Sequence, residues 1–168
     1  MNTGALAFYM GYAFCQSVNV QHVIEGDALM VPFVVYWKDS TPTAIPYPGK
    51  TQQDAVNSAI AARESNPNAY TGWSFGRDGA VTLSNGTKHD VLLIEGSVPG
   101  LKKPANMFYL YQRKPFTLVS YFNWQDNPEI RRTPDERKEF MVSFKQGINA
   151  HPFGVKCLKD IENTKPLQ

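Results

Sequence analysis

The stretch GWSFGRDGAVTLSNGTKHDVLLIEG, residues 72–96, decides the fold of this 168-residue chain. Within it, Ser-Asn-Gly-Thr at 84–87 is typical of a β-hairpin turn, because asparagine and glycine adopt positive φ at low cost. Residues 88–95 after the turn are therefore predicted to form a strand. The apolar run at 91–94 favours a central position for this strand, covered on both faces of the sheet.

Two strands are predicted before the hairpin turn. The first covers 69–75, where Trp73 and Phe75 alternate with a serine. The second covers 80–83, and Arg-Asp-Gly at 77–79 is interpreted as a turn between them. Strands that follow one another through such short connections are usually antiparallel neighbours.

Further strands are predicted on both sides of this region. Residues 29–37 are rich in β-branched and aromatic side chains, and Pro32 among them indicates an edge strand or a bulge. The proline-rich loop that follows contains a short extended piece at 43–47. Residues 107–112 and 116–124 are predicted to form a further pair of strands.

Two helices have recognisable starts. Thr51 and Asp54 form an approximate capping box, and Thr133-Pro134-Asp135-Glu136 combines a cap, a proline and acidic residues in the order that a helix start favours. The helix that begins at Thr133 is predicted to bury Phe144 in an apolar stripe and to end near Gly147. The chain from His151 onward is predicted to be irregular.

Residues 1–25 are interpreted as an apolar helix, with an opening strand as the alternative. Residues 4–15 are apolar on every side of a helix, so the segment must lie deep against the sheet or be covered by a second subunit. A helix needs about 20 apolar residues to cross a membrane, and this run is shorter. The first basic side chain is Lys38, so the start of a signal peptide is missing. We therefore expect no membrane association and a cytoplasmic location.

These elements predict one α+β domain over residues 1–168. The expected architecture is a curved, mostly antiparallel sheet of about five to six strands that two to three helices cover. Residues 159–168 are expected to form a loose tail.

The charge balance argues against binding to nucleic acid. Lysine and arginine number 17 and aspartate and glutamate 15, which leaves a net charge of +2. A nucleic-acid binder usually carries a strongly basic stripe. We therefore expect no nucleic-acid partner.

No residue pattern indicates a metal, a cofactor or a catalytic nucleophile. The histidines, His22, His89 and His151, are far apart in the sequence and fit no metal-ligand spacing. The cysteines, Cys15 and Cys157, are also far apart and fit no such spacing. The two cysteines are predicted to be reduced and buried. No G-x-S-x-G motif or glycine-rich phosphate loop occurs. The sequence therefore favours a protein that is not an enzyme.

Residues 107–124 contain the best candidate for a binding surface. In an extended chain Phe108 and Leu110 share one face while Tyr109 and Tyr111 share the other, so both faces carry aromatic side chains. The candidate ligand or partner residues are Tyr109, Tyr111, Arg113, Tyr121 and Trp124. Cover by the protein's own helices, a partner surface and a small-molecule pocket remain the three readings of this region.

The expected function is that of a non-catalytic binding protein that self-associates as a homodimer or larger closed assembly, with a protein partner as a further possibility. The helices that begin near Thr51 and Thr133 are expected to cover one face of the sheet. These two helices would leave the apolar segment at 4–15 and the aromatic ribbon at 107–124 without cover. One of the two is therefore expected at the interface between subunits. The alternative is a small enzyme or small-ligand-binding protein with a pocket between sheet and helices.

Overall fold

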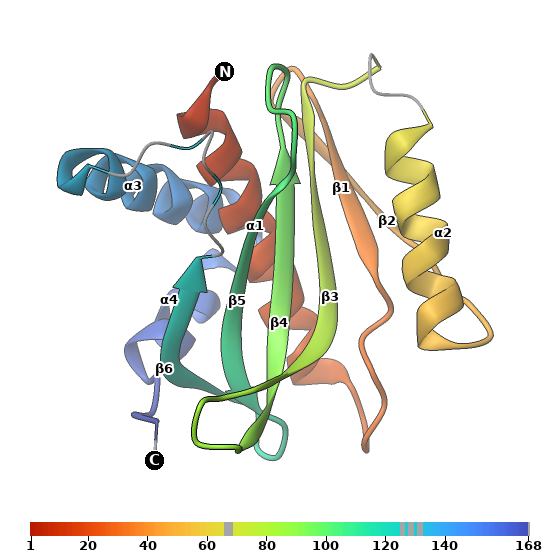
Figure 1. Cartoon of the computed structure of the whole chain (residues 1–168), viewed down its shortest axis with the longest axis vertical. Helices are drawn as coiled ribbons and strands as arrows, with labels where there is room; N and C mark the ends of the chain where they lie inside the picture. The colour runs from red at the N-terminus through yellow and green to blue at the C-terminus, as the bar shows by residue number, and fades with distance from the viewer. Residues whose placement is uncertain (66–68, 125–126, 128–129, 131–132, 168) are drawn as a thin grey trace.

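The protein folds as a six-stranded antiparallel sheet with helices on both faces (Figure 1). This computed structural model describes residues 1–65, 69–124, 127, 130 and 133–167, without the side chains of 120–124. The strand order is β2-β1-β3-β4-β5-β6. The elements are α1 (Thr3–Val23), β1 (Phe33–Lys38), β2 (Thr41–Pro46), α2 (Gln52–Glu64), β3 (Gly72–Thr82), β4 (Lys88–Ser97), β5 (Ala105–Gln112), β6 (Thr117–Trp124), α3 (Pro134–Ala150) and α4 (Gly154–Glu162). The α+β class and the antiparallel sheet are as predicted.

The hairpin of β3 and β4 forms the centre of the sheet, and Gly86 in its turn adopts a φ of 82°. The predicted turn at 77–79 is wrong. These three residues pair continuously with residues 91–93 of β4, so β3 is one long strand. Asp78 is part of this strand, and its side chain points to the α1 side of the sheet. There it accepts hydrogen bonds from buried donors, which hold this part of the chain in place.

The other half of the sheet differs from the prediction at β1. This strand begins after Pro32 and is the second strand from the end of the sheet, so the predicted edge position is wrong. The edge is instead formed by β2, which matches the extended piece predicted in the proline loop. Pro42 and Pro46 lie in β2 and lack N–H donors, a combination that edge strands tolerate.

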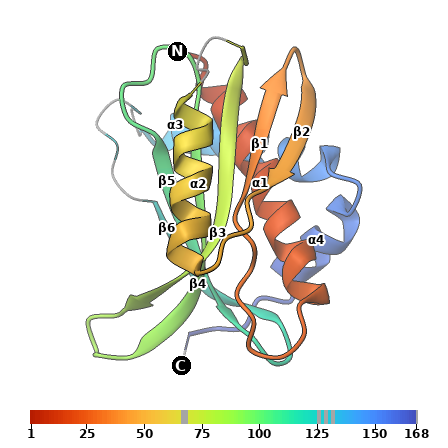
Figure 2. The same ribbon diagram turned by 90° about the vertical axis from the view of Figure 1, so that its right-hand side faces the viewer.

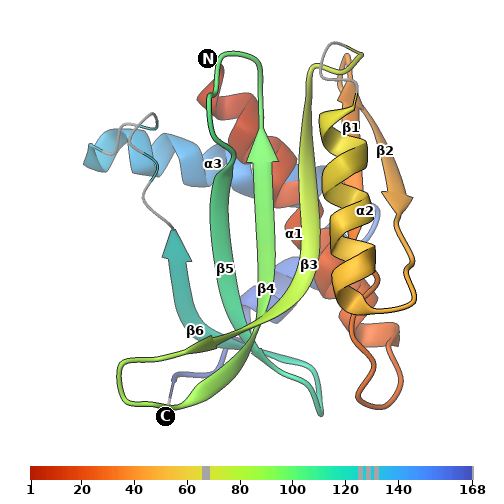
Figure 3. The ribbon, with the colours of Figure 1, turned by 45° about the vertical axis from the view of Figure 1, so that its right-hand side comes forward.

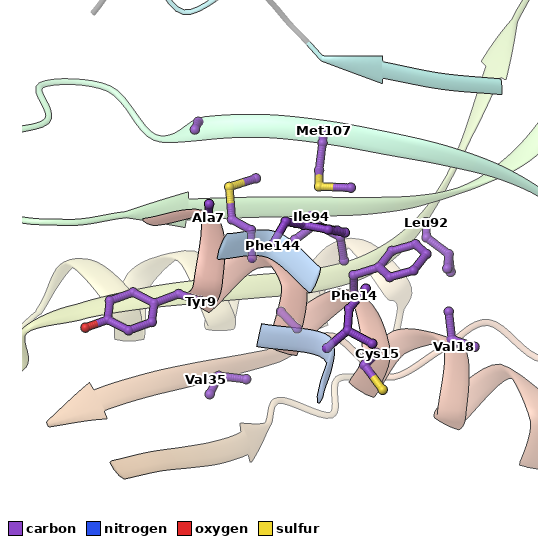
Figure 4. Close-up of a cluster of buried hydrophobic side chains, with 14 of the residues drawn as sticks. Ala7, Tyr9, Phe14, Cys15, Val18, Val35, Leu92, Ile94, Met107 and Phe144 are labelled. Atoms are coloured by element: carbon purple, nitrogen blue, oxygen red, sulfur yellow. The ribbon is translucent and has the colours of Figure 1, made fainter. Parts of the chain in front are cut away.

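The apolar N-terminal segment is a helix, and it is buried by the protein's own chain. One side of α1 packs on the sheet, where Phe14, Leu92 and Met107 are fully buried (Figure 4). Its other side meets α3, where Phe144 lies 5.7 Å from Phe14 between ring centroids. A helix that is apolar all round thus finds cover without a second subunit. The alternative strand is wrong, and so is the premise that the helices beginning near Thr51 and Thr133 together provide the cover of one sheet face.

Two glycines allow α1 and α3 to cross in backbone contact. A Cβ atom on Gly11 would lie 2.0 Å from the carbonyl oxygen of Phe144, and one on Gly147 would lie 1.9 Å from that of Phe8. Gly147 is therefore not the end of its helix, which continues to Ala150. It is a glycine because the crossing leaves no room for a side chain.

The second helix, α2, lies on the opposite face from α1, α3 and α4, so α2 and α3 do not share a face (Figure 2). Thr51 caps it by accepting from the amide of Asp54 at 3.1 Å, as predicted. Val56 and Ala59 of this helix are buried against Val34 and Phe75. Helix α2 therefore covers strands β1 and β3 on this face of the sheet.

The C-terminal region is ordered, contrary to the expected irregular chain and loose tail. Residues 154–162 form α4, because Cys157, Leu158 and Ile161 pack against the core. Beyond it, the amide of Lys165 donates to the carbonyl oxygen of Leu118 at 2.9 Å. The last described residues therefore lie against β6.

Helix α3 begins with the complete capping box that the sequence predicts. Thr133 Oγ1 accepts from the Glu136 amide at 3.2 Å, and Glu136 Oε2 accepts from the Thr133 amide at 2.8 Å.

We expect Thr133→Ala to lower the free energy of unfolding by about 1 kcal/mol, because it leaves a helix-start amide without its acceptor. Phe144→Ala should cost clearly more, since it removes a buried ring. Urea denaturation of the two variants tests the ranking. If Thr133→Ala were the worse of the two, the placement of this helix would be contradicted.

Candidate functional site

The face of β4 and β5 that points away from α1 carries a second apolar cluster, here called the open sheet face. On β5, Met107 and Tyr111 join the main core, while Phe108 and Leu110 point to the other side, as the alternation predicted. The same alternation on β4 sends Val91 to this face. The open sheet face comprises Val81, Leu83, Val91, Leu93, Phe108, Leu110, Val119 and Leu167.

Among the described residues this cluster consists of strand residues, Leu83 just after β3 and Leu167, so no described helix contributes to it. Figure 3 shows β4 and β5 with α2 to one side of them, over the neighbouring strands. Val91, Phe108 and Leu110 are buried at the base of the cluster. The other members remain partly exposed, Leu93 in the middle of β4 among them. A sheet face of this kind is normally covered by a helix or a partner.

A charged group borders the open sheet face where α2 ends. The guanidinium of Arg63 pairs with Glu95 of β4 and lies 4.5 Å from the ring centroid of Trp73. Arg77 of β3 approaches the same carboxylate, with 3.8 Å between Nη2 and Oε1.

The two arginines differ in exposure. The side chain of Arg63 is 9% exposed and that of Arg77 30% exposed. The Nε atoms of both are buried without a hydrogen-bond partner among the described residues. Two guanidinium groups thus share one carboxylate, and Arg77 is the one that solvent or a partner can reach.

Of the described residues predicted from the sequence, Tyr111 and Arg113 lie together, with 5.5 Å between the Arg113 guanidinium carbon and the centroid of the Tyr111 ring, but they do not form an exposed surface. Tyr111 is buried in the core, and its hydroxyl donates to Asp78 Oδ1 at 2.8 Å. Tyr109 faces the α1 side, where its hydroxyl lies 3.1 Å from that of Thr164. The backbones of Tyr121 and Trp124 lie in β6, but their side chains are outside the described part of the structure.

Arg113 lies at the end of the sheet, just beyond β5. Its guanidinium binds Asp90 with two hydrogen bonds, of 2.8 Å from Nε and 3.2 Å from Nη2. It also donates to the carbonyl oxygen of Ala28 at 3.3 Å. Arg113 thus joins β4 to the loop before β1.

Asp78 forms a buried polar centre beneath this loop, which sequence reasoning missed. Its carboxylate accepts from Gln21 Nε2 at 2.6 Å, from the Met30 amide at 2.5 Å and from the Tyr111 hydroxyl. Burial raises the pKa of Asp78, and it also raises that of Tyr111. The alternation of β3 could have placed Asp78 on the inner face, but the turn-like Arg-Asp-Gly sequence obscured it.

Searches against family models, curated proteins and solved structures find no significant match to this chain. None of the helices in the described part of the chain is long and apolar enough to cross a membrane. Within the same residues, no three His, Cys, Asp or Glu side chains are arranged to hold a metal ion.

Proposed function

We propose that this protein works by binding rather than by catalysis, and that it self-associates through the open sheet face. The observation that carries the proposal is an apolar sheet face that no described helix covers. Contiguous apolar side chains that stay partly exposed on one sheet face can mark an interface. A partner would bury the part of the Leu93 side chain that remains exposed in the middle of β4.

A second copy suits this face because its charged border carries both signs. Arg77 has a side chain that is 30% exposed, and Glu95 supplies the carboxylate beside it. In a two-fold dimer each Arg77 can approach the acidic group of the other copy, since one self-complementary patch meets itself. The small net charge of +2 adds little repulsion between copies.

Pairing through the sheet edges is less suitable than pairing through the face. At one edge, Pro42 and Pro46 of β2 cannot donate to another strand. At the other edge, the Leu118 carbonyl of β6 already accepts from Lys165. The expected dimer is therefore formed by packing of sheet faces.

Light scattering tests the proposal. We expect the wild-type protein to have about twice its 18.9 kDa chain mass at micromolar concentration and to dissociate on about a hundredfold dilution. Leu93→Glu should leave a monomer, because it would bury a charge at the centre of the interface.

Val142→Glu is the matched control. Val142 is 52% exposed on α3, on the other side of the sheet, so this variant should remain dimeric. Circular dichroism establishes that both variants are folded. A wild-type protein that is monomeric at every concentration would contradict the proposal, as would equal dissociation by both variants.

A further inference from the structure

After α4 the chain crosses the edge of the sheet at β6 and passes from the α1 side to the open sheet face. Thr164 is on the α1 side, where its hydroxyl lies 3.1 Å from that of Tyr109. Leu167, further along the chain, packs with the open sheet face on the opposite side. The segment of residues 164–167 is here called the strap, and Figure 3 shows the labelled C-terminus below β6.

The strap lies along β6 as an extended segment. Lys165 forms a β-bridge with Val119 in the parallel direction, and its amide donates to the carbonyl oxygen of Leu118 at 2.9 Å. Side chains alternate along an extended chain, so Lys165 and Leu167 share one face while Thr164 points to the other. Val119, the bridge partner of Lys165, belongs to the open sheet face. The pairing with β6 therefore places Leu167 on that face.

The strap is held by few interactions. Its bridge to β6 is isolated and does not continue into a ladder among the described residues. Lys165 and Pro166 are exposed, and Pro166 has no N–H group to donate. Leu167 is only partly buried. One bridge and one partly buried leucine can be released by local opening, while the sheet itself stays folded.

The strap occupies space that a second copy needs. Leu167 covers part of the open sheet face, and the Lys165 amide occupies the neighbouring edge of β6. Because packed side chains cannot share space, a second copy that covers the whole face has to displace Leu167. Release of the strap would expose the apolar side chains on which Leu167 packs, and the face would become larger.

We propose that the strap is an autoinhibitory contact that limits self-association through the open sheet face. This inference rests on the self-association proposed above and adds its regulation. In the closed state, which is the one described, Leu167 occupies the face. In the open state the whole face is free for a second copy. The apparent affinity of the dimer is therefore reduced, for each chain, by the fraction of chains that are open.

Two variants release the strap in different ways. Leu167→Ser removes its apolar contact, and Lys165→Pro removes the amide that donates to Leu118. Light scattering over a dilution series should give each variant a dimer dissociation constant lower than that of the wild type by about tenfold or more. Lys165→Ala is the matched control, because it loses the same charge but keeps the amide, and it should behave as the wild type. Circular dichroism establishes that all three are folded.

Amide exchange measures the release of the strap separately from self-association. At a concentration where the chain is a monomer, Leu167→Ser should speed exchange of the Lys165 amide by about tenfold, because the bridge to β6 opens more often. An unchanged exchange rate would overturn the inference, since Leu167 would then not hold the strap closed.

A double variant establishes which surface the released chain uses. Leu93→Glu combined with Leu167→Ser should be monomeric, since the charge lies on the open sheet face. A dimer that persists in this variant would show pairing through the freed edge of β6 and would overturn the inference.

The inference and the proposed function fail in different ways. A wild-type protein that dimerises while Leu167→Ser dimerises equally or more weakly would overturn autoinhibition and leave self-association intact. If the wild type and both strap variants were all monomeric at every concentration, self-association itself would be contradicted, and the inference with it.

Discussion

Gly11→Ala is expected to lower the free energy of unfolding by about 5 kcal/mol, comparable to the whole stability of many small domains. The added Cβ would lie 2.0 Å from the carbonyl oxygen of Phe144 and 2.9 Å from its carbonyl carbon. Added methyl groups in a packed core usually cost about 1–3 kcal/mol when side chains can adjust. Here the obstacle is the backbone of α3, so the two helices must separate and the core between them must open.

Gly4→Ala on the same helix is the matched control. A Cβ at this position would lie 3.5 Å from Asn2 Oδ1 and from Ser143 Oγ, which is ordinary contact. This variant should therefore be neutral or slightly stabilising, because alanine favours helix more than glycine does. Urea denaturation of both variants measures the difference. Equal stability of the two would contradict the crossing of α1 and α3 in backbone contact.

Asp78→Ala is expected to cost about 4 kcal/mol, because three buried donors would lose their acceptor together. These donors are Gln21 Nε2, the Met30 amide and the Tyr111 hydroxyl. They belong to α1, to the loop before β1 and to β5, so the carboxylate joins three parts of the fold. We expect the loop to loosen, with faster amide exchange at Met30.

Asp90→Ala provides the comparison for this prediction. Asp90 lies on the neighbouring strand and pairs with Arg113, but its side chain is 36% exposed. Exposed ion pairs contribute up to about 1 kcal/mol, so this variant should have a small effect. If the two variants unfolded at the same urea concentration, Asp78 would not be the buried polar centre described above.

Local patterns in the sequence predicted most of the central sheet. The Asn85-Gly86 turn, the strands on both sides of it and the alternation of Phe108 with Tyr109 all depend on neighbouring residues in the chain. The caps at Thr51 and Thr133 are local in the same sense, since each involves residues three apart. These features could be read from the sequence because no distant contact overrides them.

The features that sequence reasoning missed depend on distant contacts. The turn-like sequence at 77–79 stays extended because β4 pairs with it along its whole length. Gly147 resembles a helix end, but the reason for it is the backbone of Phe8. The region after His151 contains Pro152 and Gly154, yet α4 forms there because the core binds its apolar side.

The candidate site was predicted in part. The sequence correctly indicated two apolar faces at residues 107–112, but it assigned the candidate role to Tyr109 and Tyr111, which face the α1 side. The hydroxyl of Tyr111 is satisfied by a buried carboxylate rather than by a partner. The position of Leu167 on the open sheet face could not be foreseen, because it requires the placement of α4 beside β6.

Isotope-filtered nuclear Overhauser spectroscopy tests most directly whether two chains pair through the open sheet face. In a sample that mixes labelled and unlabelled chains at a concentration favouring the dimer, only contacts between chains appear. We predict such contacts at the methyl groups of Val81, Leu83 and Leu93. Contacts confined to the exposed side chains of Phe153 and Val155 on the α4 side, or no contacts between chains at all, would contradict the account.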